Sequence, residues 1–226
     1  GVRIEAARIL ADVPDSQFPV DQRTARENAT KEYVDSLQIN ADWPVSNVNL
    51  GNLYQRQGHI DKAITAYERA LMLDSHFIGA YINLADAYRQ QANDNAGEQV
   101  LRRGLSVLPR AADLHYALGL LLVRKGDKTA ALKELATAVK LAPDNARYAY
   151  VYAVGLNSAG KRDEALALLK ATDARHPYNL DVLGALISIN REAGNAKAAL
   201  IYAKPAAEAL PDDPTVKRLV TELEKV

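Results

Sequence analysis

The sequence of 226 residues predicts an all-α fold, a solenoid of antiparallel helix pairs that ends in a C-terminal capping helix. Two observations carry this prediction. The chain repeats itself at an interval of 34 residues. Within each interval apolar residues recur at spacings of three and four, which is the period of an amphipathic helix. We therefore expect thirteen or so helices and no sheet.

Four sets of residues recur at this interval. They are Pro109, Pro143, Pro177 and Pro211; Gly58, Gly126, Gly160 and Gly194, with Ala92 in the slot between the first two; Ala63, Gly97, Ala131, Ala165 and Ala199; and Leu50, Leu84, Leu118, Tyr152 and Leu186. Because four registers coincide at one spacing, the repeat defines the structural units of the chain.

Each interval predicts a helix, a short turn and a second helix. In the first interval these are residues 48–57, 58–61 and 63–73. The recurring glycines follow the first helices, where a left-handed C-cap favours a residue without Cβ. The recurring prolines end the second helices. Small residues such as Gly51 and Gly119 let neighbouring helices approach closely.

The N-terminal end departs from the repeat. Residues 2–11 predict a short amphipathic helix, and residues 20–39 predict a long one. In the long helix Ala29, Tyr33 and Leu37 match the second-helix register of a degenerate repeat. Since the first residue is Gly1, without an initiator Met, we expect a fragment or processed form that continues upstream.

The C-terminal end predicts a cap. Asp213 can cap a last helix over residues 214–225, which is apolar on one face and charged on the others. A solenoid needs such a helix to cover the apolar face of its last repeat.

The repeat resembles the tetratricopeptide repeat (TPR) family. Its pattern is matched by Leu50, Gly51, Tyr54, Ala63, Tyr67 and Ala70, and again by Leu118, Gly119, Ala131, Leu135, Ala138 and Pro143. Departures from the pattern are Ser75, Ala92, Gly104, Thr172 and Asn190. The resemblance covers residues 44–211 and implies a right-handed solenoid, the TPR superhelix.

The resemblance also implies the division of the chain. Five repeats cover residues 44–77, 78–111, 112–145, 146–179 and 180–213, with residues 1–43 before them and a capping helix over 214–226. Residues 2–10 resemble the second helix of a HEAT repeat. A HEAT-like helix before TPRs is similar to the C-terminal part of some bacterial multihaem c-type cytochromes. That resemblance favours the periplasm over the cytoplasm.

A groove lined by the first helices is the expected binding surface of such an array. The family's inward-facing positions are Val48, Asn49, Asn52, Ile82, Asn83, Asp86, Arg89, Tyr116, Leu120, Val123, Tyr150, Val154 and Asn157. The apolar side chains would receive apolar side chains of a peptide, and the asparagines would bind its backbone. Alternatively, these residues pack against neighbouring helices, and the asparagines form hydrogen bonds between helices.

One subclass of the family captures acidic C-termini with a clamp of lysines, asparagines and an arginine. Asn52 and Asn83 match this clamp, but Val48, Asp113 and Ala117 stand where it requires cations. We therefore exclude the clamp, because an acidic terminus would meet no cationic fork.

Other functions find little support in the sequence. The 28 Lys and Arg balance 28 Asp and Glu, and there is no Cys. His59, His76, His115 and His176 are far apart, no glycine-rich phosphate loop occurs, and the apolar runs are too short to span a bilayer. The small cluster Arg102, Arg103 and Arg110 is interpreted as a solvated face. We expect no catalysis, metal, cofactor, nucleic acid or membrane insertion.

The leading hypothesis is a non-enzymatic protein-protein interaction scaffold. It would bind a peptide, a helix or a neighbouring domain in its concave groove. The alternatives are a self-association module that forms homo-oligomers, and an accessory C-terminal domain of a larger redox protein such as a multihaem cytochrome.

Overall fold

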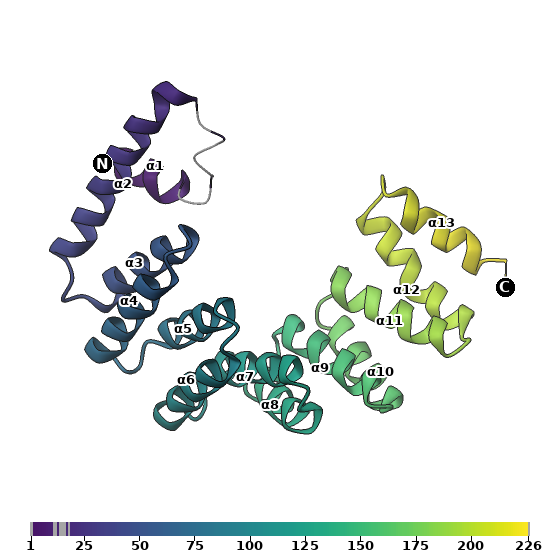
Figure 1. Cartoon of the computed structure of the whole chain (residues 1–226). Coiled ribbons are helices and arrows are strands. Elements are labelled where there is room, and N and C mark those ends of the chain that lie inside the picture. Colours follow the sequence, from purple (N-terminus) through teal and green to yellow (C-terminus); the bar gives the residue numbers. More distant parts are fainter. Residues whose placement is uncertain (1, 11–12, 14–16, 18, 226) are drawn as a thin grey trace. The chain divides into compact units, whose positions relative to one another are not determined.

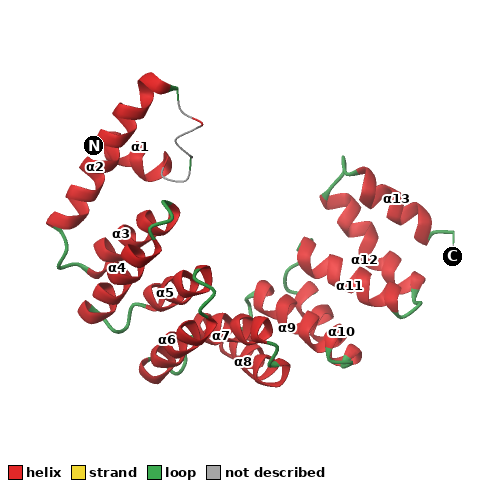
Figure 2. Ribbon diagram, in the orientation of Figure 1, coloured by secondary structure: helices red, strands yellow, loops and turns green. Residues whose placement is uncertain are grey.

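The computed structural model describes residues 2–10, 13, 17 and 19–225. Within them the chain forms thirteen helices and no strand (Figures 1 and 2). The helices are α1 (Val2–Leu10), α2 (Val20–Ile39), α3 (Pro44–Arg56), α4 (Ile60–Leu73), α5 (Ile78–Gln90), α6 (Asp94–Val107), α7 (Ala112–Lys125), α8 (Lys128–Leu141), α9 (Ala146–Ser158), α10 (Arg162–Asp173), α11 (Leu180–Glu192), α12 (Ala196–Ala209) and α13 (Pro214–Leu223). The predicted all-α fold is confirmed.

The chain divides into two compact units, Gly1–Leu121 and Leu122–Val226. In the first unit α3 packs on α4, α5 packs on α6, and α4 joins the two pairs by packing on α5. Helix α2 contacts α3, with Ala29, Tyr33 and Leu37 buried in one cluster with Leu53. These three residues therefore lie on the face of α2 that is buried toward α3.

The second unit contains two apolar clusters. The first joins α9, α10 and α11 through buried residues that include Leu156, Leu169 and Leu186. The second joins α11 and α12 to the last helix, with Leu183 and Leu223 buried within it. Helix α13 thus covers the α11/α12 pair, as expected of a cap.

Side chains fix where several helices begin. Asp213 caps α13, since its Oδ1 accepts hydrogen bonds from the backbone N–H of Thr215 at 2.7 Å and of Val216 at 3.2 Å. Asn145 and Asn179 cap α9 and α11 in the same way, one repeat length apart. Helix α3 begins at Pro44, before the predicted residue 48, because a proline in the first helical position gives up no helical hydrogen bond.

The turns within the repeats have the predicted left-handed conformation. Gly58, Gly126, Gly160 and Gly194 have φ between 74° and 84°. Ala92 fills the glycine slot of its repeat and still has a φ of 56°. The flanking helices therefore impose this conformation on a residue that carries a Cβ.

Replacing Ala92 with Gly should stabilise the first unit by about 1 kcal/mol, because glycine removes the steric cost of the left-handed conformation. Chemical denaturation of the two proteins side by side would measure the difference. A midpoint that falls in the variant would contradict the assignment of strain to Ala92.

In the part of the chain that the structure describes, no helix has both the length and the apolar character required to cross a membrane.

Candidate functional site

Polar side chains of the first unit form hydrogen bonds with one another across three helices. The Asn52 Oδ1 atom on α3 accepts from the Tyr67 hydroxyl on α4 and from Asn83 Nδ2 on α5, both at 2.8 Å. The Tyr67 hydroxyl also lies 2.7 Å from Gln55 Oε1. Burial, and then the charge of Asp86, raises the pKa of Tyr67, so its hydroxyl keeps the proton that it donates. For Asn52 and Asn83 the structure thus shows hydrogen bonds between helices, the alternative named from the sequence.

Asp86 extends this network along α5. Its carboxylate accepts from Arg89 Nε at 2.6 Å, from Gln55 Nε2 at 2.7 Å and from Gln90 Nε2 at 3.2 Å. Burial alone would raise the pKa of Asp86, but these hydrogen bonds and the charge of Arg89 outweigh it and bring the pKa below its ordinary value. The network therefore favours the ionised carboxylate.

The lowered pKa of Asp86 predicts a pH-dependent contribution to stability. A depressed folded-state pKa stabilises the folded chain above the unfolded-state pKa of about 4, and this contribution disappears as the pH falls through the folded-state value. Asp86→Asn should therefore lower the denaturation midpoint near neutral pH and have a smaller effect in acid. Denaturation curves of both proteins at several pH values test this, and a pH-independent difference would contradict it.

A small pocket lies beside this network, between α3 and α5. Asn52, Gln55, Arg56 and Gln90 line it, and its volume is about 220 Å³. Arg56 supplies the single formal charge among the lining residues, and it is positive.

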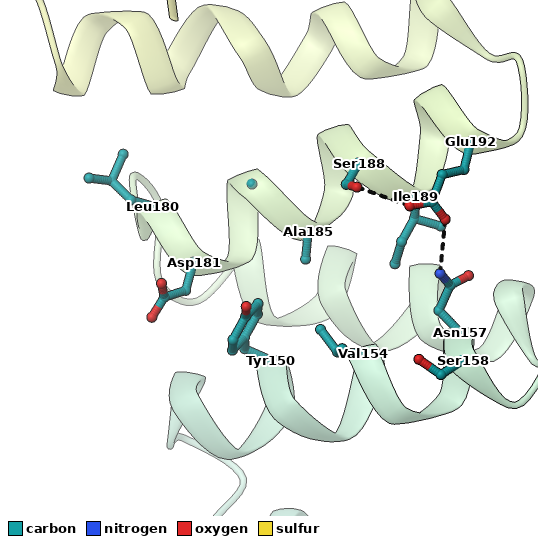
Figure 3. A pocket seen from close by; sticks show the side chains of 11 residues that line it. Tyr150, Val154, Asn157, Ser158, Leu180, Asp181, Ala185, Ser188, Ile189 and Glu192 are labelled. Carbon is teal, nitrogen blue, oxygen red and sulfur yellow. Dashed lines mark hydrogen bonds between the residues drawn. The ribbon is translucent and has the colours of Figure 1, made fainter. Parts of the chain in front are cut away.

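A larger pocket of about 400 Å³ lies in the second unit between α9 and α11, and we call it the α9–α11 pocket (Figure 3). Its lining residues are Tyr150, Val154, Asn157, Ser158, Leu180, Asp181, Gly184, Ala185, Ser188, Ile189 and Glu192. The sequence supplies this lining through helix period, since residues three and four apart share a face.

The centre of the α9–α11 pocket is apolar. Tyr150 and Val154 of α9 face Ala185 and Ile189 of α11. Val154 is 41% exposed and Leu180, at the start of α11, is 42% exposed. Apolar side chains this open to water can still lose solvent-accessible surface to a ligand.

One end of the pocket is polar and acidic. Glu192 accepts hydrogen bonds from Asn157 Nδ2 at 3.2 Å and from the Ser188 hydroxyl at 3.1 Å, and Figure 3 shows both bonds. Asp181 lies at the other end, beside Tyr150. Two carboxylates and no cation thus line this pocket. In the described chain neither carboxylate forms an ion pair.

The other groove residues are placed as follows. Asn49, Asn52, Ile82, Asn83, Asp86, Tyr116, Tyr150 and Asn157 are half-buried, while Arg89, Leu120, Val123 and Val154 are exposed. The structure corrects the prediction that Val48 faces a ligand. Only 7% of this residue is exposed, so it packs inside the first unit. Tyr116 belongs to the first unit and Tyr150 to the second.

The pocket also contains residues that were not among the candidates. Leu180, Ser158 and Glu192 are the clearest. Glu192 could have been predicted from the repeat. It lies three repeat lengths after Gln90, which lines the small pocket at the equivalent repeat position.

The metal-ligating side chains and the arginine cluster singled out in the sequence are placed as follows. In the described residues no group of three or more His, Asp or Glu could hold a metal ion. Two arginines of the cluster lie on α6 and form ion pairs, Arg102 with Glu98 and Arg103 with Glu68, each at 2.8 Å. These two guanidinium groups therefore form ion pairs on the surface of the repeats.

Comparisons with known proteins agree with this geometry. Three family models, each described as tetratricopeptide repeat, match residues 47–77, then 83–146 and 116–179, and finally 156–223. No curated protein sequence matches the chain significantly.

Solved structures share the fold at low sequence identity. MamA matches with a TM-score of 0.61 and 22% identity, over 74% of this chain and 91% of its own. YrrB matches with a TM-score of 0.60 and 23% identity, over 85% and 97%. PilW, a type IV pilus biogenesis factor, matches with a TM-score of 0.69 and 16% identity, over 97% of each chain. With its repeats, turns and cap in place, the chain belongs to the tetratricopeptide repeat family.

Proposed function

We propose that the chain is a non-enzymatic scaffold that binds a segment of another polypeptide in the α9–α11 pocket. The observation that carries the proposal is this pocket itself, in which the exposed apolar side chains of Val154 and Leu180 lie beside polar and acidic groups. Its volume of about 400 Å³ falls in the range of pockets that bind ligands. A concave pocket that combines apolar side chains with a few convergent polar groups is the usual form of a binding site.

The two units differ in what their first helices offer a partner. In the first unit the polar side chains of Asn52, Asn83 and Asp86 are already hydrogen-bonded to neighbouring helices. In the second unit Tyr150 and Val154 face an open pocket. This contrast favours the second unit as the primary binding surface.

A similar fold provides independent support. YrrB is described as a TPR protein with an unusual peptide-binding site. A peptide is thus a reasonable class of ligand for this chain.

Truncating Tyr150 to Ala should weaken binding by about 1 to 3 kcal/mol, because buried tyrosines commonly act as interface hot spots. A displayed library of random octapeptides selected on the immobilised chain supplies the probes, and titration of the selected peptides measures the loss. Val154→Asp should weaken the same peptides by placing a charge in the pocket. Its exposed position keeps the helix intact.

Lys133→Ala on α8 is the matched control, since Lys133 is exposed and does not line the pocket. It should leave affinity unchanged. Equal binding by wild type, Tyr150→Ala and Val154→Asp would refute the proposed site. A concentration-dependent mass in light scattering that Tyr150→Ala abolishes would instead identify a second copy of the chain as the occupant.

A further inference from the structure

The α9–α11 pocket and the small α3–α5 pocket occupy the same place in their repeats. Val154, Asn157 and Ser158 lie three repeat lengths after Asn52, Gln55 and Arg56. Gln90 corresponds in the same way to Glu192. Arg56 of the small pocket is thus replaced by Ser158, and neutral Gln90 by acidic Glu192. The formal charge of these lining positions is therefore positive in the small pocket and negative in the α9–α11 pocket.

Glu192 is held by hydrogen bonds from two neighbouring side chains. Asn157 and Ser188 donate to different oxygens of its carboxylate. The carboxylate retains lone pairs for a further donor, because each oxygen accepts more than one hydrogen bond. Since no cation lines the pocket, a cationic ligand group would provide the missing counter-charge.

The apolar centre lies directly beside this carboxylate. Ile189 precedes Glu192 by three residues, which places it about 4.5 Å away along the helix axis. Side chains two residues apart on an extended peptide point the same way and lie about 6.8 Å apart. If an apolar side chain of the peptide lies beside Tyr150, Val154 and Ile189, the peptide side chain two residues away would therefore point toward Glu192.

We propose that the α9–α11 pocket selects an extended segment of a partner protein in which a Lys or Arg stands two residues from an apolar anchor. The anchor fills the space between α9 and α11, and the cation binds Glu192. Asp181 adds negative potential at the other end of the pocket. This inference rests on the proposed function and specifies the chemistry of its ligand.

The octapeptide selection described above tests this specificity directly. The selected peptides should share an apolar residue two positions from Lys or Arg, and their binding should weaken as salt is added. Glu192→Gln keeps the size of the side chain and installs the residue found at the equivalent place in the first unit. It should reduce their affinity about twofold to fivefold, the upper part of the range expected for an exposed ion pair.

Charge reversal provides the sharper comparison. Glu192→Lys should bind the selected peptides about tenfold more weakly, and it should prefer versions in which Glu replaces the basic residue. Peptides that lose affinity with Tyr150→Ala but lack a basic residue and are indifferent to Glu192→Gln would overturn this inference and leave the proposed function standing. A selection that yields no binder would overturn both.

Discussion

Replacing Gly51 with Val is expected to lower the free energy of unfolding of the first unit by about 3 kcal/mol. Gly51 is buried on α3, and the Tyr67 ring lies directly against it. A Cβ at this position would be 2.6 Å from Tyr67 Cδ1 and 2.8 Å from Cζ. Overpacking of this kind costs about 1 to 3 kcal/mol, and displacing the ring also breaks the hydrogen bond that its single hydroxyl proton makes to Asn52 or Gln55, at about 1 kcal/mol.

Denaturation followed by circular dichroism and by the fluorescence of Trp43, beside α3, measures this loss. Gly184→Ala is the matched control, because a Cβ on Gly184 meets no atom within 4 Å. It should stabilise α11 by up to about 1 kcal/mol, through the higher helix propensity of alanine. Combining Gly51→Val with Tyr67→Leu should recover part of the loss. A Gly51→Val protein with the wild-type midpoint would show that Tyr67 does not pack as described.

Deleting residues 214–226 is expected to destabilise the second unit by about 5 kcal/mol and to promote aggregation. Helix α13 packs Leu223 together with Val216, Leu219 and Val220 against α11 and α12. Burial of one such side chain contributes about 1.5 to 3 kcal/mol when complete and less when partial. Removing the helix would expose Leu183, Ala199 and Ala203 to water.

Size-exclusion chromatography with light scattering and denaturation of the truncated chain test this expectation. Leu223→Ala is the milder variant, and it should cost about 2 to 3 kcal/mol without removing the helix. Lys217→Ala, on the exposed side of α13, should change stability by less than about 0.5 kcal/mol. A truncated chain that remains monomeric with an unchanged midpoint would show that α13 is not a cap.

The fold was predictable because local signals and the repeat agree. Helical period, the turn glycines and the closing prolines each indicate the same unit, so errors in one are corrected by the others. Even the two ends were predicted, since Ala29, Tyr33 and Leu37 keep the repeat register and Asp213 is a good cap. A boundary error arose at the start of α3, where Pro44 allows the helix to begin before the predicted residue 48.

The candidate binding surface was less predictable than the fold, for a physical reason. The register could place Tyr150, Val154 and Asn157 on one face, and the structure brings these three into one pocket. The repeat register could not show that Asn52 is hydrogen-bonded to Tyr67, because that bond depends on the position of a side chain from another helix. Nor does the register show whether a residue such as Val48 packs inside the unit or faces the groove.

The correspondence between the two pockets has a consequence for how such a chain can change over generations. Tandem copying of a helix pair begins with identical lining residues, and one base separates a codon for Gln from a codon for Glu. The packing of α11 depends on residues such as Val182 and Leu186, which lie on its buried face and not at position 192. A single nucleotide change can therefore alter the formal charge of the lining in one copy while the residues that pack its helices stay the same.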